Sequence, residues 1–165
     1  MFSYGLVGDE AFPLRGYLMR PYPGRALSQQ QHIFNYHLSR SRRIIENAFG
    51  ILVARWRIFR QPIIASPENA QVFVKACVAL HKFLRVDQSS VYCPQGFADS
   101  EDNTGKVVCC AWRNGLEDGS MMPITRTASN SYTAHAKALR DRPAKYFVSP
   151  SGLVSWQVDA VTTVR

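Results

Sequence analysis

One long stretch of the chain, residues 28–59, decides the fold and reads SQQQHIFNYHLSRSRRIIENAFGILVARWRIF. Ser28 followed three residues later by Gln31 has the spacing of a capping box at a helix N-terminus. Apolar residues then recur at steps of three and four, at Ile45, Phe49, Leu52, Trp56 and Phe59. This period predicts one long helix over about 28–59, which Gly50 can bend.

The residues before this helix divide into a strand and a loop. Residues 2–7 form a short, largely apolar run that reads as a strand ending at Gly8-Asp9. An acid at the C-terminal end of a strand lies where open α/β sheets place their ligands. Residues 10–27 are rich in proline and glycine and are predicted to form a connecting loop.

The residues after the helix predict a second helix, a linker and a tail. Ser66 before Pro67 is a helix start signal, and residues 67–86 are apolar on most faces, which predicts a buried helix. Residues 87–130 are rich in turn formers and are expected to be a mobile linker. Residues 131–142 predict one more helix, and the apolar residues 146–156 a tail that docks on the domain. Pro143, where that helix would continue, makes the docking less secure. The expected organisation is therefore a domain over 1–86, a linker over 87–130, and a helix with a docking tail over 131–165.

Composition excludes several classes of protein. A chain of 165 residues with 46% hydrophobic residues can bury a sizeable core, so a disordered protein is not expected. The apolar runs are far shorter than the roughly 20 residues that span a bilayer, so no membrane association is expected. The N-terminus also lacks the basic start of a signal peptide. Four cysteines without CxxC spacing predict reduced thiols in a cytosolic or nuclear protein.

The positive charge is concentrated in one third of the sequence. Residues 11–67 hold nine arginines and one acid, which accounts for a charge of +8. The arginines are Arg15, Arg20, Arg25, Arg40, Arg42, Arg43, Arg55, Arg57 and Arg60. The planar fork of Arg suits phosphate oxygens, so a polyanion such as DNA is the expected partner.

Two acids are candidates for chemistry. Glu46 follows Arg42 and Arg43 by about one helical turn. It is therefore either part of a salt bridge on the helix surface or a metal ligand flanked by phosphate-binding groups. Asp9 is either an ordinary turn residue or a ligand at the end of a strand. Spacing alone leaves both alternatives open.

Other polar candidates favour structural readings. The acids Asp99, Glu101 and Asp102 are interpreted as a solvated patch in the linker. Cys77 and His81, one turn apart on an apolar helix, are interpreted as core residues in preference to metal ligands.

Trp56 suggests stacking on nucleic acid, but it continues the apolar stripe, so core packing is favoured. Its neighbours Arg55 and Arg57 then project outward.

Several motifs occur in an order that resembles a known family. They are GDEAFPL (8–14), YLMRPY (17–22), IFNYHLSRSRRIIENAFGIL (33–52), RWR (55–57) and LHKFL (80–84). The tail strings AKYF (144–147) and GLVSWQ (152–157) match more loosely. Together they are similar to the Harbinger-type DDE nucleases, which derive from transposases.

The resemblance implies a site, a fold and partners. It makes Asp9 and Glu46 the second and third members of an acidic triad that binds divalent metal, Mg²⁺ or Mn²⁺, for cleavage of DNA. It implies an RNase H-like α/β fold. The concentration of arginines, for its part, makes Arg40, Arg42, Arg43, Arg55 and Arg57 the expected nucleic-acid-binding residues. The resemblance also implies a Myb-like accessory protein and action in the nucleus, with the cytoplasm as a second compartment.

The sequence departs from the family pattern at two points. The first acid of the triad precedes the Gly-Asp motif by a long segment in the family, whereas residues 1–8 contain no acid. The family also usually has Asn where Lys82 follows His81. We therefore expect a partial RNase H-like fold, one strand plus long helices without the N-terminal strands, with impaired catalysis. The alternatives are a non-catalytic DNA- or protein-binding remnant, and a truncated gene copy without a maintained function.

Overall fold

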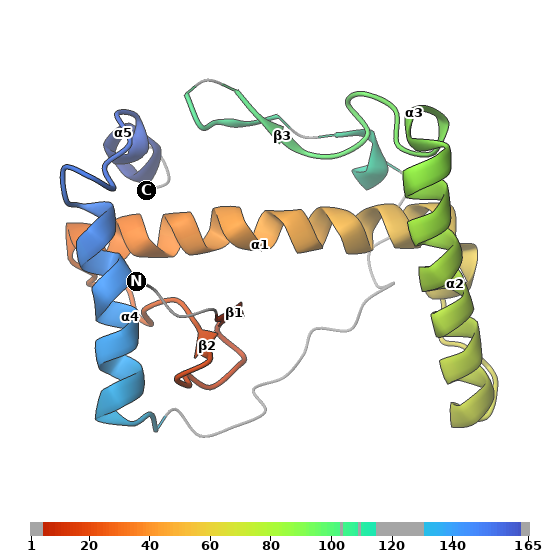
Figure 1. The fold of residues 1–165 in the computed structure, drawn as a ribbon, viewed down its shortest axis with the longest axis horizontal. Coiled ribbons are helices and arrows are strands. Elements are labelled where there is room, and N and C mark those ends of the chain that lie inside the picture. Colours follow the sequence, from red (N-terminus) through yellow and green to blue (C-terminus); the bar gives the residue numbers. More distant parts are fainter. Residues whose placement is uncertain (1–4, 103, 109, 115–130, 163–165) are drawn as a thin grey trace. The chain divides into compact units, whose positions relative to one another are not determined.

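The computed structural model describes residues 5–102, 104–108, 110–114 and 131–162, and these are mainly helical (Figure 1). Four strands of two residues each form two small sheets, one parallel and one antiparallel. This mixture of helices and short strands confirms the predicted partial α/β class. None of the described helices is long and apolar enough to cross a membrane.

The chain divides into two compact units. The first unit contains residues 1–43, 103–106 and 123–165, and the second contains residues 44–102 and 107–122. The longest helix, α1 (Gln29–Arg55), contributes its N-terminal part to the first unit and its C-terminal part to the second.

Helix α1 begins with the predicted capping box. The Ser28 amide donates to the Gln31 side chain at 2.9 Å, and the Gln31 amide donates to the Ser28 hydroxyl at 3.3 Å. The helix continues without interruption past Gly50 to Arg55, and the 3-10 turn η1 (Arg57–Phe59) follows. Gly50 serves packing, since a Cβ atom there would lie 2.6 Å from the Trp112 ring. The long helix is therefore confirmed.

The first unit begins with a strand pair that the sequence predicted only in part. Strands β1 (Leu6–Val7) and β2 (Leu18–Met19) pair in parallel, with Leu6 opposite Leu18. The strand predicted over residues 2–7 is confirmed at β1, and residues 2–4 lie outside the described part. Strand β2 falls in the stretch predicted to be only a loop, because two paired residues are too few for a periodic signal.

The core of the first unit joins the start of α1 to the end of the chain. Phe34, which is 1% exposed, packs with Tyr22, Leu38 and Ala144 of helix α4 (Ala134–Phe147). The rings of His37 and Phe147 stack with centroids 4.2 Å apart.

The side chain of Gln157, which opens helix α5 (Gln157–Thr162), is fully buried. Its oxygen lies 2.9 Å from Nε2 of His37, and its amide donates to the carbonyl of Phe147. These contacts hold the start of α5 against α1 and α4, and helix α4 runs through Pro143. The predicted division of the chain into a domain, a linker and a docking tail stays a prediction.

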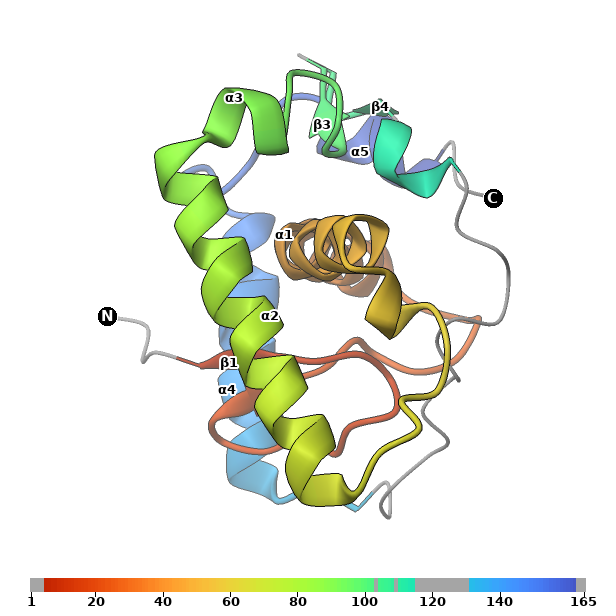
Figure 2. The ribbon, with the colours of Figure 1, turned by 90° about the vertical axis from the view of Figure 1, so that its right-hand side faces the viewer.

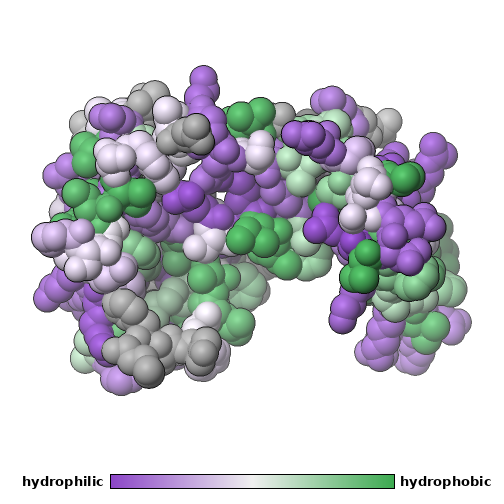
Figure 3. All heavy atoms as spheres, turned by 45° about the horizontal axis from the view of Figure 1, so that its top comes forward, coloured by the Kyte–Doolittle hydropathy of each residue, from purple (hydrophilic) through white to green (hydrophobic). Residues whose placement is uncertain are grey.

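The second unit is built on α1 and α2 (Pro67–Asp87), and Figure 2 shows α2 along its full length. Ser66 caps α2 by accepting a hydrogen bond from the Asn69 amide at 3.4 Å, as the start signal predicted. The predicted burial is wrong, because Cys77 is the only buried residue of α2. Over the surface of α2, hydrophobic side chains lie interspersed with hydrophilic ones (Figure 3).

The segment after α2 packs on α1. It contains α3 (Ser89–Tyr92), the antiparallel pair β3 (Ser100–Glu101) and β4 (Val107–Val108), and the 3-10 turn η2 (Ala111–Arg113). Tyr92, Cys110 and Trp112 form a core cluster with Ile51. The pattern predicted a linker over 87–130, whereas the described residues to 114 include these packed elements, and residues 115–130 lie outside the described part.

The described cysteines Cys77, Cys93 and Cys110 are free thiols, as predicted, and Cys109 lies outside the described part.

Candidate functional site

Asp9 lies two residues beyond the last residue of β1 in the parallel strand pair of the first unit. The Gly8 amide donates to the Met19 carbonyl at 2.8 Å, which extends the β1–β2 pairing up to the position just before Asp9. One carboxylate oxygen of Asp9 accepts a hydrogen bond from the Ala11 amide at 2.9 Å, so the side chain closes a turn. The second oxygen is not used in this turn. The acid is therefore held at a strand end with one oxygen directed elsewhere.

That second oxygen faces an arginine of α1. Oδ2 of Asp9 lies 3.9 Å from an Nη atom of Arg42, and the Asp9 side chain remains 39% exposed. At this distance and exposure the pair stabilises the fold by at most about 1 kcal/mol. The contact thus orients a solvent-accessible carboxylate toward the basic helix without burying it.

Glu46 lies on α1 one helical turn after Arg42 and is exposed. Asp9 belongs to the first unit and Glu46 to the second, so their pairing stays a prediction. Within the described part of the chain, no group of three or more His, Cys, Asp or Glu side chains is arranged to hold a metal ion. The carboxylates of Asp9 and Glu46 are hard oxygen donors of the kind that Mg²⁺ and Mn²⁺ prefer, so they fit such an ion in chemistry but supply only two side chains.

The predicted phosphate-binding arginines have different surroundings. In the first unit, the guanidinium of Arg40 lies over the Trp156 ring at 4.6 Å. In the second unit, Arg55 lies over the Phe97 ring at 4.3 Å and donates through Nε to the Tyr92 carbonyl. Arg40 and Arg55 therefore also fasten other segments to α1.

Arg57 begins η1 and is exposed, while Arg43 is half-exposed on α1. Both side chains therefore keep solvent-accessible surface that can contact a ligand.

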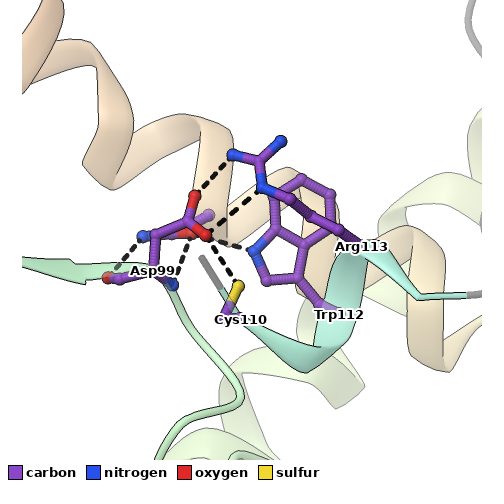
Figure 4. A network of polar contacts seen from close by, with 5 residues as sticks. Asp99, Cys110, Trp112 and Arg113 are labelled. Atoms are coloured by element: carbon purple, nitrogen blue, oxygen red, sulfur yellow. Dashed lines mark hydrogen bonds and ion pairs between the residues drawn. The ribbon is translucent and has the colours of Figure 1, made fainter. Parts of the chain in front are cut away.

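A polar network in the second unit joins Asp99, Cys110, Trp112 and Arg113 (Figure 4) and is bonded to Asn47 of α1. Asn47 accepts hydrogen bonds from the Asp99 amide at 3.1 Å and from the Trp112 indole at 2.9 Å. The Asp99 carboxylate is bound by the Arg113 guanidinium at 2.5 Å and accepts from the Cys110 thiol at 2.8 Å. The prediction that Asp99 belongs to a solvated patch is therefore wrong, because its side chain is fully buried by these partners.

The same contacts shift two pKa values. The hydrogen bond from Arg113 lowers the pKa of Asp99, with a smaller contribution from Cys110 and against the effect of burial. Burial, and then the hydrogen bond to Asp99, raises the pKa of the Cys110 thiol to about 11. Near neutral pH the network consequently holds a carboxylate and a protonated thiol, which is the combination that lets the thiol donate.

A pocket of about 270 Å³ adjoins this network in the second unit. Ile44, Asn47, Ala48 and Ile51 of α1 line it, together with His81 and Arg85 of α2 and Ala98. The Tyr92 hydroxyl accepts a hydrogen bond from the Trp56 indole at 3.0 Å and lies 2.8 Å from Nδ1 of His81. Burial and the charge of Arg85 lower the pKa of His81. The contact with Tyr92 thus holds the His81 ring at the pocket wall.

Sequence reasoning missed Asn47 and Trp112. The available signal was the position of Asn47 directly after Glu46, inside the run 42–50, whose other residues are charged, apolar or glycine. A half-buried amide on an amphipathic helix needs polar partners, and here a segment distant in the sequence supplies them.

Comparison with known proteins gives one match. Residues 3–82 match the family model described as DDE superfamily endonuclease, and this stretch includes β1, β2, α1 and most of α2. No curated protein matches the chain. No solved structure matches it either. The family match supports a relationship to DDE superfamily endonucleases, which use divalent metal ions and act on DNA.

Proposed function

We propose that residues 3–82 are part of a metal-dependent DNA endonuclease derived from a Harbinger-type transposase. In this proposal Asp9 and Glu46 are the two carboxylates that the chain contributes to the catalytic centre. The family match over the same residues supports the endonuclease class. The motifs around Gly8-Asp9 and Arg42-Arg43 favour the Harbinger type.

The observation that carries the proposal is the setting of Asp9. Its carboxylate lies directly after a parallel strand pair, uses one oxygen in a local turn, and directs the other toward Arg42 on α1. Glu46 follows on the same helix, one turn later. A carboxylate kept partly open beside a guanidinium suits a centre that must hold cations and phosphate oxygens together.

Asp9 and Glu46 would hold the divalent ion, which when bound activates water and stabilises the charge that develops on phosphate oxygens. The chain's own residues then have separate tasks. Arg42 orients Asp9 in the absence of DNA and can turn to a phosphate when DNA is present. Arg43 and Arg57 neutralise phosphates along the backbone, while Arg40 and Arg55 combine this role with packing.

The 165 residues are expected to cleave DNA inefficiently by themselves. The proposal assigns two carboxylates, one fewer than the acidic triad that the resemblance implies, so another segment or another chain would supply the third. Removing a single group that stabilises developing charge costs on the order of 10²–10³ in rate. We expect at least that loss for a missing metal ligand.

Plasmid nicking in Mg²⁺ and in Mn²⁺ tests this proposal. We expect weak nicking by the 165-residue chain, and much stronger nicking by a longer chain that adds the family's strands and their Asp. Asp9→Asn and Glu46→Gln keep size and hydrogen bonding and should each abolish the activity of the longer chain. Robust nicking by the 165-residue chain that Glu46→Gln abolishes would show that the site is complete. Activity of the longer chain that survives both substitutions would overturn the site assignment.

A second candidate is a DNA-binding remnant without catalysis, which the absence of a third clustered ligand among the described residues favours. In this case the protein binds DNA in the nucleus without cleaving it. The binding has little sequence preference. If about six phosphates are neutralised, affinity falls by about three decades between 50 and 200 mM salt.

A matched pair of variants tests the binding surface. Arg43→Gln/Arg57→Gln should weaken binding and lower the salt slope by about two. Lys137→Gln/Lys145→Gln, which removes two exposed charges from α4, should change neither. Equal effects of the two changes would show that binding follows net charge alone and that the arginine surface has no special role.

A further inference from the structure

Helix α2 carries an apolar stripe on its solvent-exposed side. The residues of the stripe recur at steps of four and three and are Val72, Ala76, Ala79, Phe83 and Val86. Val72, Phe83 and Val86 are 60%, 59% and 79% exposed, and the two alanines are also exposed. An alternation of four and three is the spacing of the contact positions in a coiled coil. The stripe therefore has the period of a helix that packs against another helix.

This stripe is distinct from the face that α2 uses in its own unit. Cys77 is buried and Leu84 packs on the core cluster around Ile51, so these two residues mark the inner face. With about 100° per residue, the stripe lies roughly 130° round the helix from that face. The high exposure of its side chains shows that no described element of the unit covers it.

The two borders of the stripe differ in charge. The first border, on one side of the stripe, contains Lys75 and Lys82, which are seven residues apart. The second border, on the other side, contains Phe73, Leu80 and Asp87. Lys75, Lys82 and Asp87 form no ion pair with any described residue. In coiled coils the residues at these two borders select the partner and its direction.

We propose that α2 is a dimerisation helix, whose exposed stripe packs in parallel against the same stripe of a second copy of this chain. In a parallel pair, each residue of the first border faces the second border of the partner helix, at the position five residues later in the sequence. Lys82 of each copy then meets Asp87 of the other, which forms two symmetric ion pairs. Lys75 meets Leu80 across the interface.

The opposite direction is disfavoured by the same residues. In an antiparallel pair the two basic borders would face each other, and Lys75 would lie against Lys82 of the partner. The alanines at positions 76 and 79 allow the helices to approach closely at the centre of the stripe. The contact spans about 22 Å of helix, so we expect a dimer of moderate strength, with a dissociation constant on the order of micromolar.

Sedimentation equilibrium of the 165-residue chain, over concentrations that bracket the micromolar range, tests the dimer. We expect a monomer–dimer equilibrium that Phe83→Lys weakens at least tenfold. Phe83 is more than half exposed, so this variant should remain folded, which circular dichroism verifies. A wild-type chain that stays monomeric, or a dimer that Phe83→Lys leaves unchanged, would overturn the proposal.

Charge reversals test the direction. Lys82→Glu should weaken the dimer several-fold, because the introduced carboxylate would face the carboxylate of Asp87, and Asp87→Lys should weaken it similarly. Combining both changes in one chain, or mixing the two single variants, should restore association. Lys75→Glu is the matched control and should have little effect, since this position meets an apolar residue. Stronger association of Lys82→Glu alone would indicate antiparallel packing and contradict the proposed arrangement.

Discussion

The two units of the chain bury their apolar residues in different ways. In the first unit, Phe34 and Leu38 are covered by α4 and the tail, and a fully buried Gln157 ties that tail to α1. In the second unit, a short polar network around Asp99 fixes residues 110–113, while the outer face of α2 stays uncovered by described residues. The first unit therefore covers its core with its own segments, whereas the second presents a surface suited to a further partner.

The largest effect is expected from opening the core of the first unit. Phe34→Ala should lower the free energy of unfolding by about 3–5 kcal/mol, because it leaves a cavity between the Tyr22 and Phe147 rings. Urea denaturation measures this loss. Ile64→Ala in the second unit, where the side chain is fully exposed, should change stability by no more than about 0.5 kcal/mol. Similar losses for both variants would remove the distinction between the units.

A smaller, pH-dependent effect is expected in the second unit. The pKa of Cys110 is raised from 9.0 to about 11 in the folded chain, so the unfolded chain loses this proton first as pH rises. The contribution of the protonated Cys110 thiol to the free energy of unfolding is fully present below pH 9. About 2–3 kcal/mol of this contribution is lost between pH 9 and 11. The free energy of unfolding of the wild type should therefore fall more steeply between pH 9 and 11 than that of Cys110→Ala.

Cys93→Ala is the control, because it keeps the buried thiol of Cys110. It should retain the wild-type slope between pH 9 and 11, and an identical slope in all three proteins would contradict the role assigned to the network.

The smallest effect is expected where α1 meets Trp112. Gly50→Ala places a methyl group against the indole, which costs about 1–3 kcal/mol, offset by about 1 kcal/mol of helix propensity. We expect a net loss of up to about 2 kcal/mol by thermal denaturation. In a Trp112→Ala background the clash is absent, so the same substitution should be neutral or stabilising. Destabilisation of equal size in both backgrounds would place the cause elsewhere.

Local signals predicted the helices well. The capping box at Ser28 and the Ser66-Pro67 start predicted the first residues of α1 and α2 to within one residue, whereas α1 ends at Arg55, four residues before the predicted end at 59. Strand β2 and the packing of Tyr92, Cys110 and Trp112 were missed, because both depend on partners far away in the sequence. The exposure of α2 was missed for the same reason, since apolar content predicts burial only where another segment covers it.

The candidate site was predictable in its residues more than in its contacts. The position of Asp9 at a strand end followed from a short apolar run, and the arginines of α1 followed from their concentration. The Asp9–Arg42 contact joins a loop to a helix, and no spacing rule relates such segments. The burial of Asp99 was hidden for a similar reason, because its partners Asn47 and Arg113 lie on separate elements.

The central claim, that Asp9 and Glu46 hold the same divalent ion, is tested most directly by a double-mutant cycle of Mn²⁺ binding. Calorimetry or electron paramagnetic resonance gives the affinity for wild type, Asp9→Asn, Glu46→Gln and the double variant. We expect each single change to weaken binding of the same ion by about tenfold or more, and the double variant to bind no more tightly than either single variant. Single variants that bind Mn²⁺ as tightly as the wild type would show that the two carboxylates do not share an ion.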